Sequence, residues 1–273
     1  IVDLLAGDIG HRVAGGAGAT RALAALEAEL RGIPGLEVEV QQVSAFAEGP
    51  YTGASLYTVR NLLARLPGAE DGEQGPGSVF LAAHYDTPPS SVGAADDAVG
   101  VAAVVEVARC LAAGPRLRRT VVFLIDEGEE LGLFGARGFL RHPWARGTVA
   151  YLNLESAGAR GRPVLFQAGP GAAWLADAYG AAPHPHATVL GQDVFQSGAI
   201  PSDTDFRVYS ATGVRRLDLA LYRDCWAYHT HLDAPARLQP GSLQEMGDNA
   251  LAVVRELATR DVPPATDGPP AVY

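Results

Sequence analysis

The sequence of 273 residues contains no lysine, so all 21 of its basic residues are arginine. The absence of lysine excludes two classes of enzyme: those that need a P-loop lysine to bind phosphates and those that form a Schiff base on a lysine amine. The basic residues are also outnumbered by 31 acidic ones, which gives a formal net charge of −10. A protein that binds duplex nucleic acid would carry a basic stripe, so we expect no nucleic-acid partner.

Cysteine and long apolar runs are also scarce. The two cysteines, Cys110 and Cys225, belong to no Cys-x-x-Cys pair, which excludes a structural zinc ribbon. We expect Cys110 to be a small buried residue on an apolar helix and Cys225 to lie in a loop. No apolar run reaches the roughly 18 residues that a membrane span needs. The chain begins without Met and without a signal peptide, so we expect a mature or excised piece.

Hydrophobic periodicity predicts one α/β domain in which strands alternate with helices. Apolar and β-branched runs predict strands over 36–43, 55–66, 78–83, 119–125, 148–154, 163–167 and 216–221. Helical spacing predicts helices within 10–30 and over 96–113, 131–140, 171–179 and 242–260. This alternation predicts a three-layer fold, with a mostly parallel central sheet and helices on both faces. We expect the domain to cover residues 1–261 and the Pro-rich residues 262–273 to form a linker.

Histidines and carboxylates stand at the carboxyl ends of four predicted strands. These groups are His84 with Asp86, Asp126 to Glu130, Asn153 to Glu155, and Tyr228 to Thr230, and Asp96 with Asp97 opens a helix between them. Taken singly, each group has a structural interpretation, such as an N-cap for the Asp pair. Ligands of open α/β sheets bind beyond the carboxyl ends of the strands, so five such groups together favour a binding site.

The chemistry of this set favours a metal centre. Several carboxylates in one place stay ionised together only with a compensating cation, and histidine with carboxylate suits a divalent ion such as zinc. The side chains suffice for two ions that share one bridging carboxylate. Two ions about 3.5–4 Å apart polarise a carbonyl and lower the pKa of a shared water. A further carboxylate must accept the proton, and Glu129 and Glu130 can divide the roles of base and ligand.

The same residues form motifs that resemble a known family, the co-catalytic zinc exopeptidases typified by bacterial leucyl aminopeptidases and glutamate carboxypeptidase. The motifs occur in the family's order: HYD at 84–86, GAADDAVG at 93–100, GEELGLFGA at 128–136, NLE at 153–155 and YHT at 228–230. The resemblance extends from GHRVAG at 10–15 to the last predicted helix. It implies the zinc-exopeptidase (aminopeptidase-like) α/β fold, a peptide substrate and two divalent metal ions, most simply zinc.

The resemblance also implies the metal ligands. Asp96 would bridge the two ions, His84 and Glu155 would complete one site, and Glu130 and His229 the other.

Other matching residues would act around these ligands. Glu129 would be the general base, and Tyr228 would donate a hydrogen bond to the tetrahedral intermediate. Asp86 and Asp233 would orient ligand histidines, with Asp97 also in the outer layer. The family further implies a cis peptide bond between Asp96 and Asp97. Residues 202–205 are expected to cap a helix and, by the resemblance, to line the substrate pocket.

Glu155 replaces an Asp that many soluble aminopeptidases of this family carry, which indicates a subgroup. Residues 153–171, 201–210 and 228–254 look most like endoplasmic reticulum metallopeptidases and vacuolar membrane proteases. In that branch membrane spans follow the peptidase domain, so we expect the excised, extracytoplasmic catalytic domain of a membrane protein. The leading interpretation is a two-zinc aminopeptidase. The alternatives are a glutaminyl cyclase with one working zinc and a non-catalytic binding module on the same fold.

Overall fold

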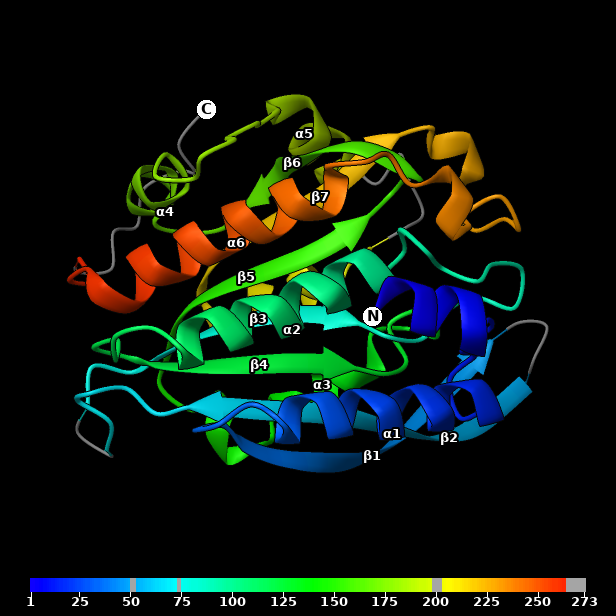
Figure 1. Ribbon diagram of the computed structural model, residues 1–273, viewed down its shortest axis with the longest axis horizontal. Coiled ribbons are helices and arrows are strands. Elements are labelled where there is room, and N and C mark those ends of the chain that lie inside the picture. Colours follow the sequence, from blue (N-terminus) through cyan, green and yellow to red (C-terminus); the bar gives the residue numbers. More distant parts are fainter. Residues whose placement is uncertain (50–52, 73–74, 198–202, 264–273) are drawn as a thin grey trace.

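The computed structural model describes residues 1–49, 53–72, 75–197 and 203–263 (Figure 1). Within these residues seven strands form one sheet of order β1-β2-β4-β3-β5-β7-β6. The strands are β1 (Glu37–Gly49), β2 (Gly53–Leu66), β3 (Ser78–His84), β4 (Thr120–Asp126), β5 (Thr148–Ser156), β6 (Arg160–Ala168) and β7 (Arg215–Arg223). All seven predicted strands are therefore present, and β1 extends beyond its predicted end at Val43 to Gly49.

The four central strands, β4, β3, β5 and β7, run parallel to one another. Both margins are antiparallel, because β1 and β2 form a hairpin beside β4 and β6 returns along β7. The predicted mostly parallel sheet is confirmed for its centre, with antiparallel strands at each margin. The carboxyl ends of the four parallel strands therefore lie along one edge, which we call the carboxyl edge of the sheet.

Alternating side chains of the central strands build two apolar cores, one on each face. On β3, Val79, Leu81 and Ala83 belong to the larger core, whereas Phe80 and Ala82 belong to the smaller one. The ring of Phe80 stacks on Tyr151 with the centroids 4.2 Å apart. Because strand side chains alternate with a period of two, a strand buried on both faces shows a continuous apolar run.

Helices cover both faces, as predicted. They are α1 (Ala17–Arg31), α2 (Ala98–Ala112), α3 (Phe134–Phe139), α4 (Ala172–Tyr179), α5 (Val189–Gln196) and α6 (Ser242–Thr259). Figure 1 shows α1, α2 and α6 lying across one face of the sheet, where they contribute to the larger core. On the other face α3 packs against β1 and β2, and the 3₁₀ helix Asp205–Thr212 packs against β7.

The described residues contain helical segments that were not predicted: a π-helix over Asp3–Ile9, helix α5, and short 3₁₀ helices over Pro143–Ala145, Cys225–Ala227 and Pro235–Arg237. Cys225 therefore begins a short helix where a loop was expected. The 3₁₀ helix Asp205–Thr212 follows the segment that was expected to cap a helix. Helix α3 begins at Phe134 and not at Leu131, because Leu133 adopts a left-handed conformation with φ of 61°. The prediction for Cys110 was wrong, since its position on α2 faces solvent; both cysteines are free and exposed. Of the predicted linker, residues 264–273 lie outside the described residues. Among the described helices none is long and apolar enough for a membrane span.

Candidate metal centre and substrate pocket

The carboxyl edge of the sheet brings the predicted site residues together from four strands. His84 is the last residue of β3, Glu129 and Glu130 follow β4, Glu155 lies near the end of β5, and His229 follows β7. Parallel strands side by side place their carboxyl ends in one row, so residues up to 145 positions apart in the sequence meet here.

Asp96 lies at the centre of this group and contacts both histidines. Its Oδ1 lies 3.1 Å from Nε2 of His84, and its Oδ2 lies 3.2 Å from Nε2 of His229. The same Nε2 of His84 lies 3.7 Å from Glu155, and that of His229 lies 3.1 Å from Glu130. The five predicted ligands thus form two trios that share Asp96.

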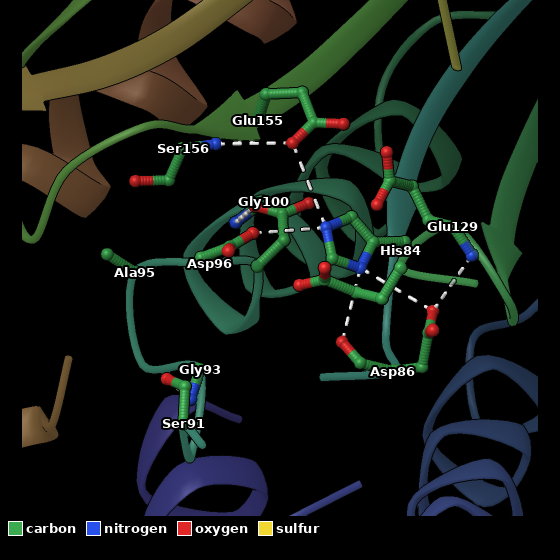
Figure 2. Close-up of polar contacts among 12 residues, drawn as sticks. His84, Asp86, Ser91, Gly93, Ala95, Asp96, Gly100, Glu129, Glu155 and Ser156 are labelled. Carbon is green, nitrogen blue, oxygen red and sulfur yellow. Dashed lines mark hydrogen bonds and ion pairs between the residues drawn. The ribbon is translucent and has the colours of Figure 1, made fainter. Parts of the chain in front are cut away.

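Asp86 orients the ring of His84 through its Nδ1 atom. Nδ1 of His84 lies 3.2 Å from the backbone oxygen of Asp86 and 3.6 Å from its carboxylate, so Nε2 points at Asp96 and Glu155 (Figure 2). The carboxylate of Asp86 also accepts a hydrogen bond from the backbone amide of Glu129. Asp86 therefore fixes both a candidate ligand and the residue predicted to be the base.

Asp97 and Asp233 hold the backbone on either side of Asp96. Asp97 is the N-cap of α2 and accepts from the amide of Gly100 at 3.0 Å, and the Asp96–Asp97 peptide bond is cis, as expected. The carboxylate of Asp233 accepts from the amides of Ala95 and Asp96 at 2.8 and 3.1 Å. In the structure Asp233 thus orients Asp96, which corrects the prediction that it orients a histidine ring. The reason is that the carboxylate of Asp233 lies next to the backbone amides of Ala95 and Asp96, which need an acceptor.

The carboxylates of the centre are buried and repel one another. Burial raises the pKa of Glu129 and of Glu155 well above the usual range, and burial with the nearby charge of Asp96 raises the pKa of Glu130 to about 7. Burial opposes the charge of His229, but Asp96 and Glu130 outweigh it and raise its pKa to about 9. The buried charges of the described residues therefore favour a cation between them.

The donor atoms fit such a cation. Oδ2 of Asp96, Oε1 of Glu130 and Nε2 of His229 are buried without a geometrically acceptable hydrogen-bond partner among the described residues. Ligand atoms of His84, Asp96 and Glu130 lie within 4.8 Å of one another. Imidazole nitrogen with carboxylate oxygen is a donor set that zinc accepts, and buried polar atoms are otherwise satisfied. A divalent metal would satisfy them.

A pocket of about 350 Å³ opens beside the centre and includes Asp96, Glu129 and Glu155 in its wall. Part of its wall is aromatic: the ring centroid of Phe166 lies 5.2 Å from that of Phe195 and 5.4 Å from that of Tyr222. Tyr228 lines the pocket and stacks on the ring of His229 at 3.7 Å. Asp203 and Thr204, from the segment expected to line a substrate pocket, also lie in this wall, whereas Ser202 lies outside the described residues.

The predicted cap at this segment differs from the structure. Thr204 occupies the N-cap position of the 3₁₀ helix, but it makes no capping bond. Its hydroxyl instead donates to Asp218 on β7 at 2.6 Å. Donation leaves the lone pairs of the hydroxyl oxygen available, so the missing cap follows from the orientation of the side chain, which points to a buried carboxylate as the stronger acceptor.

Sequence reasoning missed Arg12, which lies behind the metal centre and is fully buried. Its guanidinium donates to five backbone oxygens, those of Leu5, Gly10, Tyr85, Val92 and Gly93. Burial lowers the pKa of Arg12 to about 10, against the nearby charges of Asp86 and Asp96. Arg12 thereby fixes the loop between β3 and α2. An arginine within the GHRVAG motif was the available signal.

Sequence reasoning also missed Asp218, a fully buried carboxylate in the middle of β7. Burial raises the pKa of Asp218 to about 7, against three side chains that donate to it: Thr204, Asn153 and Gln167. Asp218 as the one charged residue within the otherwise apolar run LDLAL at 217–221 was the signal here. A lone charge in a buried strand requires partners, which only the folded structure identifies.

Comparison with known proteins identifies the family. Residues 61–254 match the family model described as peptidase family M28. The chain belongs to this family. The M28 chain is 39% identical over 243 residues to endoplasmic reticulum metallopeptidase 1 of Mus musculus and 40% identical over 201 residues to the vacuolar membrane protease of Candida albicans. The matches cover 86% and 74% of the chain, but 27% and 23% of those proteins, so the chain spans about a quarter of their length.

Solved structures share the M28 fold at low sequence identity. A zinc aminopeptidase from Bacillus subtilis matches with a TM-score of 0.73 at 15% identity, over 95% of this chain and 93% of that one. A glutaminyl cyclase from Porphyromonas gingivalis matches with a TM-score of 0.70 at 18% identity, over 94% and 96%. The predicted fold and family are confirmed: the chain is a member of peptidase family M28. Because the fold hosts two chemistries, it does not decide between them.

Proposed function

We propose that this M28 domain is a two-zinc aminopeptidase. The observation that carries the proposal is the central carboxylate of Asp96, which directs one oxygen to each histidine. His84 and Glu155 would hold one zinc, Glu130 and His229 the other, and Asp96 both. Two zinc ions, when bound, supply a polarised scissile carbonyl and a water of lowered pKa.

Glu129 would move the proton in this reaction. Its backbone is fixed by Asp86, and its side chain lines the pocket beside Asp96 and Glu155. Burial raises its pKa, which suits a group that takes a proton from water and returns it to the leaving amine. Tyr228, which also lines the pocket, would donate to the oxygen that becomes negative.

The charge of the pocket favours a substrate with a free amino terminus. Glu129, Glu155 and Asp203 line it, and no arginine stands among the described residues of its wall. Arg207, outside that wall, forms an ion pair with Asp203, so the two glutamates carry the argument. The chain has no lysine that could reach the pocket. A carboxypeptidase needs a cation for the terminal carboxylate of its substrate, whereas a terminal ammonium pairs with carboxylates.

A matched pair of peptides tests this specificity. The zinc-loaded domain should release the first residue of a free peptide and leave the same peptide intact after N-terminal acetylation. Cleavage from the carboxyl end, or equal cleavage of both peptides, would contradict the proposal. Cyclisation of an N-terminal Gln peptide without hydrolysis would favour a glutaminyl cyclase, the other chemistry found on this fold.

The location of the domain is a further part of the proposal. The relatives that match the chain are named for the endoplasmic reticulum and the vacuolar membrane. We place the catalytic domain on the extracytoplasmic side of a membrane, joined to a membrane region in the full-length protein. Protease protection of tagged full-length protein in sealed vesicles should show the domain inside; digestion from the cytoplasmic side would contradict this placement.

A further inference from the structure

Asp218 occupies the middle of a buried polar network on the face of the sheet that carries the smaller core. Its backbone neighbours across the sheet are Asn153 on β5 and Gln167 on β6. Oδ1 of Asp218 accepts from the amide of Asn153 at 3.1 Å. Oδ2 accepts from Gln167 at 3.1 Å and from the hydroxyl of Thr204 at 2.6 Å. Both oxygens are therefore engaged by donors.

One branch of this network leads to the metal centre. The amide nitrogen of Asn153 that donates to Asp218 also donates to Oε1 of Glu155 at 3.3 Å. The oxygen of the same amide accepts from the hydroxyl of Tyr151, so the amide cannot turn over without losing partners. The other oxygen of Glu155 faces His84. Asp218 thus fixes the direction in which Glu155 points.

The other branch leads to the substrate pocket. Thr204 is buried and lines that pocket together with Glu155. Its hydroxyl is attached to β7 by the short bond to Asp218 and makes no capping bond. The wall of the pocket is thereby attached to the carboxylate that orients Glu155.

We infer that Asp218 is a positioning residue that holds the metal ligand Glu155, through Asn153, and the pocket residue Thr204 with one carboxylate. The inference rests on the proposed metal-binding role of Glu155. Outer-layer partners of metal ligands change metal affinity by about 10–100-fold when they are lost. Thr204 lines the substrate pocket and is bonded to Asp218, which is not itself a candidate metal ligand. The loss of this bond should nevertheless weaken metal binding.

Three threonine variants test this inference. Thr204→Val removes the hydroxyl and keeps the shape of the side chain. We expect it to weaken zinc binding to the metal-free domain about tenfold, and Thr204→Ser to restore the affinity. Thr120→Val is the matched control, because the buried Thr120 also donates to a carboxylate, Asp71 at 2.7 Å, but at the opposite edge of the sheet. It should leave zinc affinity within twofold.

Competition against a chelator measures the affinity without any turnover. Wild-type zinc affinity in Thr204→Val, with only KM for the substrate raised, would overturn the inference, since Thr204 would then serve the pocket alone. An equal loss in Thr204→Val and Thr120→Val would overturn it too. If zinc affinity follows the expectation but no peptide is hydrolysed, the inference holds and the proposed function fails.

Discussion

The carboxylate of Asp96 faces two histidines at once, with Oδ1 3.1 Å from Nε2 of His84 and Oδ2 3.2 Å from Nε2 of His229. Two carboxylates complete the arrangement, Glu155 beside His84 and Glu130 beside His229. Asp233 holds the backbone of Asp96 in place. The arrangement predicts that Asp96 serves two ions and each of the outer carboxylates only one.

Replacement of Asp96 should therefore affect both metal sites. We expect Asp96→Asn to weaken the binding of both ions by more than the roughly 10–100-fold typical of an outer-layer partner. Glu130→Gln should weaken one ion and leave the other bound. Stepwise zinc titration of the metal-free variants distinguishes these outcomes. Retention of one tight zinc in Asp96→Asn would contradict a bridging role.

Glu129 should be needed for turnover but not for metal. We expect Glu129→Gln to lower kcat by about 10²–10⁴-fold with an unchanged zinc content, since the variant keeps the shape but cannot take a proton. Glu127→Gln in the same loop is the control. Glu127 accepts from the backbone amides of Gly15 and Arg60, so its loss should lower stability and change kcat little. Similar kcat values for the two variants would refute the assignment of the base.

Arg12 should matter to stability more than an exposed arginine. Arg12→Met removes five hydrogen bonds to backbone oxygens, of which only those of Leu5 and Gly93 also accept from a backbone amide among the described residues, so we expect a loss of at least about 2–3 kcal/mol in the free energy of unfolding. The side chain of Arg21 makes an exposed hydrogen bond to the backbone oxygen of Ile9. Arg21→Met should therefore lower the free energy of unfolding by less than about 0.5 kcal/mol. Denaturant unfolding of the metal-free variants measures both, and equal losses would count against the role of Arg12.

Metal-free protein should become less stable as the pH rises from about 5 to 9. Burial raises the pKa of Glu130 and Asp218 to about 7 and that of Asp205 and Asp233 to about 6. These groups bind protons more tightly in the folded chain than in the unfolded chain. Their contribution to stability is therefore full below about pH 4 and is lost as the pH passes 6–7.

His229 changes the stability in the same direction. Because its pKa is raised to about 9, its contribution to stability is full below about pH 6.5 and is lost as the pH rises through 9. The lowered pKa of Asp96 matters only in stronger acid. We expect the melting temperature of the metal-free protein to fall by roughly 5–10 °C over this range. Zinc should remove most of the fall, because it binds the deprotonated groups. A melting temperature that rises with pH in the presence of chelator would contradict this prediction.

Most of the fold could be predicted because its strands are buried on both faces. The run Val79–Ala83 is apolar at every position, and the structure buries all of it. Beyond Val43 all residues of β1 except Phe46 are small or polar, so the continuation of the strand depends on pairing with β2, for which the local sequence gives no signal. Helix α5 contains Gly191 and is only eight residues long, which is too weak a local pattern.

The site could be predicted where chemistry follows a strand, and not where it depends on distant contacts. His84 and Glu155 end or nearly end strands, so their convergence followed from the parallel sheet. The contact of Asp233 with Asp96 spans 137 positions, and the bond from Thr204 to Asp218 replaces a cap that the local sequence favours. Tertiary packing, and not the local sequence, decides which groups form such hydrogen bonds.

The number of zinc ions per chain in active protein tests the central claim most directly. Elemental analysis of the dialysed domain, combined with activity during stepwise zinc addition, should give two ions per chain, with peptide hydrolysis reaching its full rate only near the second. Full activity at one ion per chain, with no further binding, would contradict a centre built around Asp96.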